Sequence, residues 1–262
     1  MKRIIAILLI SVLMFACKTV PFTGRKQLSL ISNQTVLTLS LQQYNDFIHS
    51  AQLSNDANAK AMVTRVGQRL AAAVSTYYRS NGKSAELKNF SWEFNLVNST
   101  QVNAFCMPGG KIVVYTGILQ YTQTEDGLAV VLGHEIAHAL AQHANERLSQ
   151  QVAVQLGGIG LDVALSNKSQ ETRNLGAAVF GLGAQVGVLL PFSRKHELEA
   201  DRIGLILMAM AGYNPQTAPA FWQRMAANGT KTPEFFSTHP SDANRIKQLQ
   251  SCMPEALRYY KK

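Results

Sequence analysis

Two histidines four residues apart, with a glutamate directly after the first, constrain this chain more than any other feature. They lie in the segment His134-Glu135-Ile136-Ala137-His138. Residues four apart on a helix lie one above the other on the same face, so both imidazoles can reach one ion. Zinc binds neutral histidine nitrogens readily. Glu135 is placed to accept a proton from a water in an open coordination position. The segment therefore predicts one Zn²⁺ per chain with a general base beside it.

The residues around this segment predict a helix whose histidines face the interior. Thr122-Gln123-Thr124-Glu125 is typical of a capping box, and Glu125 and Asp126 suit a first helical turn. Apolar residues then recur at helical spacing, namely Leu128, Val131, Leu132 and Ala139. Polar groups on such a face are costly unless a metal or hydrogen bonds satisfy them. The alternative is an ordinary amphipathic helix with surface histidines.

Zinc needs a third protein ligand, and a second predicted helix around residues 193–204 offers candidates. Glu197 and Asp201 share one face of that helix. This spacing favours Glu197 as the ligand and Asp201, one turn on, as the acceptor that fixes the tautomer of a zinc-bound histidine. Glu199 points to another side and is the less favoured ligand. A charged helix face in ion pairs with neighbouring arginines is the alternative without a metal.

With these two motifs the sequence resembles the gluzincin metallopeptidases, the family of the CAAX prenyl protease, the membrane protease HtpX and periplasmic relatives. Residues 21–28 resemble the start of the mature periplasmic members, residues 103–110 their segment ahead of a strand, and residues 237–241 their late His-Pro motif. The resemblance implies a zincin-like metallopeptidase domain that hydrolyses peptide bonds. In the family the first Glu of Glu-x-x-x-Asp is the third ligand, which carries over to Glu197.

The same resemblance places His239 and Arg245 near the metal. Either side chain would then stabilise the oxyanion that forms during peptide hydrolysis. His239 has a second expected role, in which it occupies the open zinc position and blocks it. A turn-forming Thr-His-Pro without chemistry is the remaining alternative.

The other three histidines are expected to lie outside the zinc site. We expect His143 to be solvated or ion-paired beside Glu146 and Arg147, because it lies well around the helix from the ligands. His196 is expected to be exposed, with a position behind the metal ligands as the alternative, because it lies about a quarter turn from Glu197. His49 is expected on the surface of an amphipathic helix.

The N-terminus predicts a secretion signal that ends at a cysteine. Met1-Lys2-Arg3 precedes an apolar run, residues 4–16, that is too short to span a bilayer comfortably. Leu13-Met14-Phe15-Ala16-Cys17 resembles a bacterial lipobox. We therefore expect a signal peptide over residues 1–16, a lipid-attached tether over 17–32 that begins at Cys17, and a single zinc metallopeptidase domain over 33–262. An uncleaved anchor and a plain secreted form are the alternatives.

These features predict a lipid-anchored, periplasm-facing protein of the bacterial cell envelope. Lys18 stands where an Asp would favour retention in the inner membrane, so the outer membrane is the expected location. The formal net charge of +9 favours an anionic membrane surface or acidic substrates. Nucleic acid is not an expected partner, because the Lys and Arg residues are scattered. In an oxidising compartment, Cys106 and Cys252 either form a disulfide or remain two thiols.

The remaining pattern predicts a mainly helical α+β fold with a small sheet beside the active-site helix. Helices are expected over about 33–52 and 59–78, and strands over residues 90–97 and 111–115. An edge of such a sheet can bind an extended peptide as an added strand. Residues 151–192 are expected to form helices packed on the domain, with a membrane-inserted hairpin as the alternative.

The expected function is zinc-dependent endopeptidase activity on unfolded or misassembled envelope proteins, as part of quality control. The alternative is an envelope chaperone or binding module whose zinc site blocks itself and cleaves little.

Overall fold

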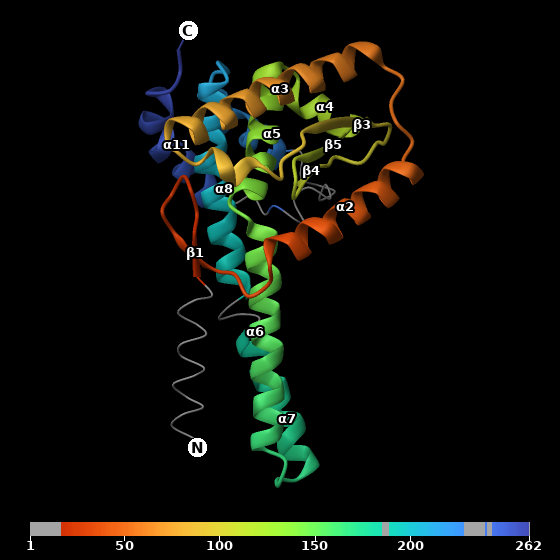
Figure 1. Cartoon of the computed structure of the whole chain (residues 1–262), viewed down its shortest axis with the longest axis vertical. Coiled ribbons are helices and arrows are strands. Elements are labelled where there is room, and N and C mark those ends of the chain that lie inside the picture. The colour runs from red at the N-terminus through yellow and green to blue at the C-terminus, as the bar shows by residue number, and fades with distance from the viewer. Residues whose placement is uncertain (1–16, 185–188, 228–238, 240–242, 262) are drawn as a thin grey trace. The chain divides into compact units, whose positions relative to one another are not determined.

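The computed structural model describes residues 17–184, 189–227, 239 and 243–261. Its elements are β1 (Cys17–Thr19), β2 (Lys26–Leu28), α2 (Asn33–Ser50), α3 (Ala57–Ser80), the short 3₁₀ helix η1 (Ser84–Leu87), β3 (Glu93–Val97), β4 (Ala104–Met107), β5 (Lys111–Tyr115), α4 (Thr116–Thr122), α5 (Glu125–Leu140), α6 (His143–Ala164), α7 (Gln170–Ala184), α8 (Leu190–Met210), α9 (Thr217–Ala227) and α11 (Ala243–Leu257). Helices make up most of the chain (Figure 1), so the predicted mainly helical α+β fold is confirmed. The predicted signal peptide lies outside the described residues.

The chain divides into two compact units. The first unit comprises residues 1–36 and 142–196, and the second comprises residues 37–141 and 197–262. Both histidines of the His-Glu-x-x-His segment and both acidic candidates of the second motif belong to the second unit. The metal site can therefore be described within that unit alone.

The second unit contains a three-stranded sheet in the order β3-β5-β4. β3 runs parallel to β5, and β4 pairs with β5 as an antiparallel hairpin. The hairpin turns at Gly109 and Gly110, whose φ angles of 93° and 83° favour glycine because other side chains rarely adopt them. In the central strand, Ile112, Val113 and Val114 are all fully buried. Both faces of β5 are therefore covered.

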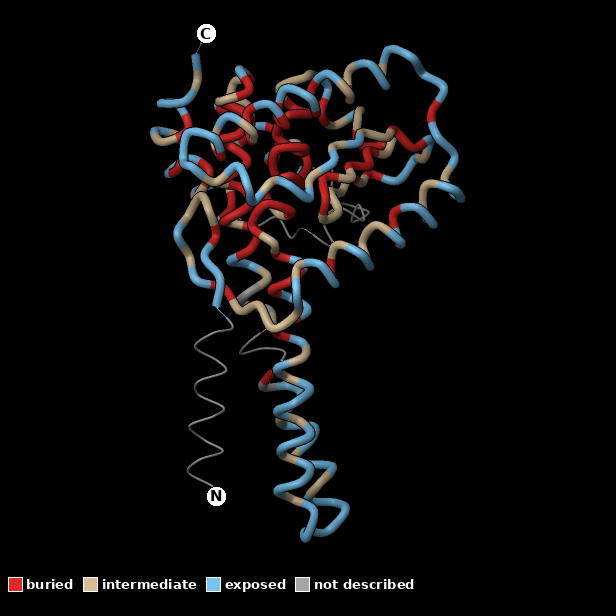
Figure 2. Tube along the Cα trace, in the orientation of Figure 1, coloured by how far each residue is buried: buried red, intermediate tan, exposed pale blue. Residues whose placement is uncertain are grey.

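Helix α5 forms the centre of the second unit. It contacts α3, α4, α9 and β4, and nearly all of its residues are buried, which Figure 2 shows as a red helix. Leu128, Val131 and Leu132 are completely inaccessible, as are Phe221 and Trp222 of α9. Burial of such apolar side chains contributes roughly 1.5–3 kcal/mol each to folding. The helix that carries the two histidines is thus surrounded by packed elements of the second unit, which fix its position.

Sequence patterns located most elements of this unit, with errors at their ends. Helices α2 and α3 lie within two residues of the predicted bounds, and β5 spans the predicted residues 111–115. β3 begins at Glu93 instead of residue 90, and β4 was not predicted as a strand. The predicted capping box over residues 122–125 is wrong. Thr124 is the N-cap, and its hydroxyl accepts a hydrogen bond from the Gly127 amide at 3.1 Å.

The first unit combines a β-hairpin with a helical hairpin. β1 and β2 pair antiparallel, with Cys17 opposite Leu28, so the segment predicted as a tether includes a short sheet. Helices α6 and α7 pack on each other. Several large apolar side chains of these two helices are exposed, namely Leu156, Ile159, Val163, Leu175, Val179 and Leu182. Over the described residues, no helix combines the length and apolarity that a membrane crossing needs.

Candidate metal centre

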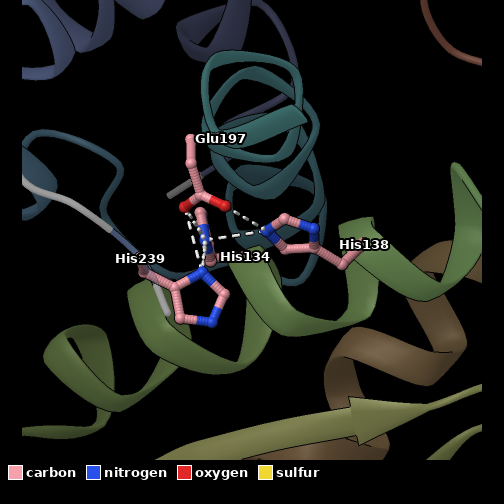
Figure 3. Close-up of side chains that lie close together, drawn as sticks. All are labelled: His134, His138, Glu197 and His239. Atoms are coloured by element: carbon pink, nitrogen blue, oxygen red, sulfur yellow. Dashed lines mark hydrogen bonds and ion pairs between the residues drawn. The ribbon is translucent and has the colours of Figure 1, made fainter. Parts of the chain in front are cut away.

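Four side chains from three parts of the second unit converge on one point (Figure 3). His134 and His138 project from successive turns of α5, Glu197 from α8, and His239 from the residues before α11. One ligand atom from each lies within 4.8 Å of all the others. Three of these residues are the ligands predicted from the two motifs, and the fourth is the histidine of the late His-Pro motif.

The spacing of these atoms suits a zinc ion. His134 Nε2 lies 3.1 Å from His138 Nε2 and 3.3 Å from Glu197 Oε2, and His239 Nδ1 lies 3.0 Å from Glu197 Oε2. Around a tetrahedral zinc with bonds of roughly 2.1 Å, ligand atoms lie about 3.4 Å from one another. The four atoms therefore fit one small tetrahedral cation with little rearrangement.

Two carboxylate oxygens at this point lack hydrogen-bond partners among the described residues. They are Glu197 Oε1 and Glu135 Oε1, both on buried side chains, and each lies 3.4 Å from a histidine Nε2 atom, of His138 and His239 respectively, without a hydrogen bond. A buried, unsatisfied carboxylate oxygen is costly unless a cation or a hydrogen-bond donor completes it. A metal ion would complete Glu197 Oε1, and a water beside that ion would complete Glu135 Oε1.

His134 is oriented by a chain of buried contacts behind it. Its Nδ1 lies 2.9 Å from Asp201 Oδ1, so an Nδ1–H donor leaves Nε2 bare to face the cluster. Arg245 donates to both oxygens of Asp201, at 2.8 and 2.7 Å. The guanidinium also lies 3.8 Å from the centre of the Trp222 ring. Asp201 thus occupies the position expected of a residue that fixes a histidine tautomer.

The contacts of Arg245 are mainly with protein groups. Besides Asp201 and Trp222, it donates to the His239 carbonyl at 3.3 Å and lies 3.5 Å from Glu197 Oε2. A bidentate hydrogen bond combined with a stacked ring fixes a guanidinium in place. This arrangement favours positioning of the cluster over the predicted oxyanion role for Arg245.

Close contact between two helices brings the ligands together. A Cβ atom built on Gly204 of α8 would lie 2.9 Å from the His134 backbone nitrogen, and one on Gly133 of α5 would lie 3.0 Å from the Gly204 carbonyl oxygen. Real Cβ atoms tolerate such distances only if the backbones separate. The glycine pair therefore allows α5 and α8 to approach closely enough for Glu197 to reach both histidines. Sequence reasoning gave these glycines no role.

The buried charges shift one another's pKa values. Burial lowers the pKa of His134, but hydrogen bonds to Asp201 and Glu197 outweigh it and raise the pKa to about 9. Burial opposes ionisation of Glu197, yet the neighbouring histidines hold its pKa far below the usual range. The pKa of Glu135 is raised, chiefly by burial. The cluster thus attracts positive charge strongly, while Glu135 holds a proton more readily than an exposed glutamate.

Two histidines predicted at the surface are buried in the first unit. The sequence predicts His143 in the helix that carries the ligands, but α5 ends at Leu140 and Gln142 has a left-handed φ of 56° before α6 begins. His143 stacks on His196, with ring centres 4.2 Å apart. His196 Nε2 lies 2.8 Å from Glu146, which Arg25 also contacts. His143 is therefore not solvated, one of the two forms predicted for it, and as predicted it is not among the four converging residues. The prediction of an exposed His196 is wrong, whereas His49 is exposed as predicted.

The remaining candidates lie apart from the cluster. Glu199 is buried in α8 but is not one of the four converging residues. Cys106 lies in β4 and Cys252 in α11, and both are free thiols. Each sulfur has a different neighbour, the Met107 carbonyl for Cys106 and the Gln248 amide for Cys252. The predicted alternative of a disulfide between them is absent from the structure.

Comparison with known proteins identifies a matching family and several relatives. A family model described as peptidase family M48 matches residues 61–253. The mitochondrial metalloendopeptidase OMA1 of Schizosaccharomyces pombe is 40% identical over 173 residues, which cover 65% of this chain and 49% of that protein. Human mitochondrial metalloendopeptidase OMA1 is 32% identical over 91% of this chain and 46% of its own length.

Bacterial relatives match as well. The beta-barrel assembly-enhancing protease of Escherichia coli is 28% identical over 77% of this chain and 40% of its own length. The chain thus spans about half or less of the length of these three relatives. None of the three is named as a CAAX prenyl protease, an HtpX protein or a lipoprotein, so that narrower resemblance remains a prediction. The family model covers most of the chain and both metal-binding motifs, and the chain belongs to peptidase family M48.

Proposed function

We propose that this protein is a zinc-dependent endopeptidase. The observation that carries the proposal is the convergence of His134, His138 and Glu197 around one point, with the buried Glu135 beside them. These three ligands with an adjacent carboxylate make a catalytic zinc site when the fourth position is open to water, which requires that His239, the fourth converging side chain, move away from the metal. Family membership and the names of the relatives support the same activity.

The roles of the side chains follow from their positions. When bound, zinc would polarise the scissile carbonyl and lower the pKa of a neighbouring water. Glu135 would accept a proton from that water and then donate it to the leaving amine. Asp201 would hold His134 in the tautomer that presents Nε2, and Arg245 would hold Asp201.

An edge of the three-stranded sheet supports a binding site for a polypeptide substrate beside the metal. β4 is an edge strand of the sheet and contacts α5, the helix that carries Glu135. An extended peptide paired with this edge would use main-chain hydrogen bonds, which do not depend on its side chains. We propose unfolded or misassembled proteins of the bacterial envelope as the substrates. The name of the bacterial relatives, beta-barrel assembly-enhancing protease, supports a role in quality control there.

His239 supports a second candidate function, a zinc site that blocks itself. Its Nδ1 lies 3.0 Å from Glu197 Oε2 and 3.3 Å from His134 Nε2, among the expected ligand atoms. A fourth protein ligand there would exclude water from zinc. The protein would then cleave only after His239 moves away, or would act mainly as a chaperone or binding module.

Metal analysis combined with a protease assay tests the proposal. We expect one zinc ion per chain, digestion of unfolded casein, loss of digestion with a chelator and recovery with added zinc. Purified protein that contains zinc yet leaves casein intact would favour the self-blocked binding module. Protein that binds no zinc would contradict both functions.

We further propose that a lipid on Cys17 anchors the protein to the envelope, with the outer membrane as the expected location. Exposure of Cys17 at the start of the described chain is compatible with this modification. Labelling of cells with a palmitate analogue tests it. Label on the wild-type protein and none on Cys17→Ser is the expected result, and an unlabelled wild-type protein would end the proposal.

A further inference from the structure

We infer that a cavity in the first unit is a binding site for an acyl chain, and that the chain is the one attached to Cys17. The inference rests on the proposed lipid attachment and is independent of the proposed peptidase activity. The cavity has a volume of about 650 Å³. Sites for small molecules in proteins typically measure roughly 300–1,000 Å³. The cavity is therefore large enough for a bound hydrocarbon chain.

The walls of the cavity are mostly apolar, with the charged side chains of Lys26 and Glu146 and the polar side chains of Gln27 and Gln150 among them. One wall is the β1–β2 hairpin, including Leu28, and the others are formed by α6 and α7, including Val154, Phe180 and Ala184. On α6, the small residues Ala153 and Gly157 also line it and are themselves exposed. The Phe180 ring packs against Gly157, where an added Cβ atom would lie 2.9 Å from the ring, so the apolar space beside this contact is bounded by the small side chain of Ala153. An elongated apolar group is the ligand that this lining favours.

Two unpaired polar atoms in the wall indicate which hydrogen-bonding groups the polar end of that ligand carries. The side chains of Gln27 and Gln150 both line the cavity and are each only 5% exposed. Gln27 Oε1, an acceptor, and Gln150 Nε2, a donor, have no hydrogen-bond partner among the described residues. Buried polar groups are almost always paired. The carbonyl of an acyl group would accept from Gln150, and an amide-linked acyl group would also donate to Gln27.

The position of Cys17 identifies the source of the acyl chain. Cys17 is itself part of the cavity wall, exposed at the end of β1 and paired with Leu28 across the hairpin. A lipid on this residue needs no linker to enter the cavity, so its effective concentration there is far higher than that of a free fatty acid. Its binding would also fix the β1–β2 hairpin against α6 and α7.

A binding assay tests whether the cavity accepts acyl chains. The probe is cis-parinaric acid, a fatty acid whose fluorescence rises when it leaves water, and the protein is the Cys17→Ser chain, which carries no lipid. We expect saturable binding at one site. Ala153→Trp, which fills the slot, should weaken binding by about tenfold or more, since a blocked apolar pocket loses most of its contacts.

The matched control is Ala177→Trp, an equally exposed alanine on α7 outside the cavity wall, which should bind the probe normally. Circular dichroism checks that each variant folds, and Val154→Trp replaces Ala153→Trp if the latter does not. Absence of saturable binding, or equal affinity in the cavity-filling and control variants, would overturn the acyl-chain site.

A second experiment identifies the source in the lipidated protein. A photoreactive benzophenone side chain is introduced at position 154, inside the cavity, or at position 177 as the control. Irradiation followed by mass spectrometry should link the lipid of the Cys17 peptide to the photoreactive residue at position 154 and not to the one at position 177. A lipidated protein without that link would overturn Cys17 as the source. A protein without lipid would refute the lipid attachment and with it this source, while the parinaric acid result would still stand on its own.

Discussion

Glu135 is the side chain whose removal should separate metal binding from catalysis. It lies in the cluster but is not one of the four converging ligands, and one of its oxygens has no hydrogen-bond partner among the described residues. We expect Glu135→Gln to retain one zinc per chain and to lower kcat by about 10³-fold, because the proton acceptor is lost. Turnover of an unfolded substrate and metal content are the measurements. The control is Glu199→Gln. It changes a buried glutamate of α8 that is not among the four converging ligands, so this variant should stay active.

The position of His239 determines whether water can reach the fourth coordination position of zinc in the resting protein. Because its ring nitrogen lies among the ligand atoms, we expect His239→Ala to expose the fourth zinc position and to raise kcat several-fold, with a modest loss of zinc affinity. A role in stabilising the oxyanion predicts the opposite sign, a fall in kcat of about a hundredfold. Steady-state kinetics at saturating zinc distinguish the two. Unchanged kcat and KM would leave His239 without a role in the reaction.

Arg245 should influence the metal more than the reaction. Both of its hydrogen bonds to Asp201 depend on the planar guanidinium, which lysine cannot replace. We expect Arg245→Lys to weaken zinc binding by about 10- to 100-fold, the usual effect of losing a partner behind a metal ligand. At saturating zinc, kcat should change little. A large fall in kcat under that condition would instead indicate direct contact with the oxyanion.

The packing of helix against helix sets the geometry that these side chains use. Gly204 allows α8 to approach the backbone of α5 at His134. We expect Gly204→Ala to destabilise the protein by about 1–3 kcal/mol, as over-packing does, and to weaken zinc binding because Glu197 moves with α8. Gly160→Ala is the control, since open space surrounds that glycine of α6. It should be neutral or stabilising, because alanine favours helix. Equal effects of the two substitutions would contradict the role of the glycine pair.

Periodicity predicted these elements well wherever one pattern dominates a long segment. The helix of the His-Glu-x-x-His segment and the central strand β5 are apolar over most of their length. β5 has the predicted bounds, and the helix is present as predicted although both of its ends were misplaced. The cap was misplaced because Thr122 and Thr124 are chemically alike. Only the positive φ of Gln123, 60°, shows that one helix ends there before the next begins. β4 was missed because a four-residue strand has too little pattern of its own.

More of the candidate site than of the fold could be predicted, because the spacing of its residues along a helix decides which side chains lie together. Residues four apart on one helix face lie together in any fold that keeps the helix, so His134 and His138 could be paired from sequence. The interruption between α5 and α6 at Gln142 could not be predicted from the sequence. Glutamine rarely adopts a left-handed φ, so its presence does not indicate that a helix ends there. His143 was therefore assigned to the wrong helix. Its stacking on His196 depends on residues more than 50 positions apart, which no local pattern reveals.

For the chain as a whole, the buried charges fall into two separate groups. In the second unit, Glu197 and Asp201 are balanced by Arg245 and by the cluster that attracts a metal ion. In the first unit, Glu146 is balanced by Arg25 and His196 without any part in the metal site. Chelation should therefore act only on the group in the second unit, whereas acid should act on carboxylates of both groups, because the pKa values of Glu197, Asp201 and Glu146 are all lowered.

The ion pairs of Glu146 lead to a prediction about stability in acid. Burial alone would raise the pKa of Glu146, but hydrogen bonds from His196 and Arg25 lower it from 4.5 to about 2. The depressed folded-state pKa means that the carboxylate contributes its full stability above about pH 4.5. That contribution is lost as the pH falls from about 4.5 towards about 2, where the folded protein also takes up the proton.

Glu146→Gln should remove this contribution at neutral pH. We expect the variant to be less stable by about 3 kcal/mol at pH 7, since one partner of a buried ion pair is gone. The difference from the wild-type protein should shrink as the pH falls through that window. Urea unfolding at a series of pH values measures it, with Glu171→Gln on exposed α7 as the control. A difference that stays constant down to about pH 3 would mean that lost packing, and not the lost charge, destabilises the variant.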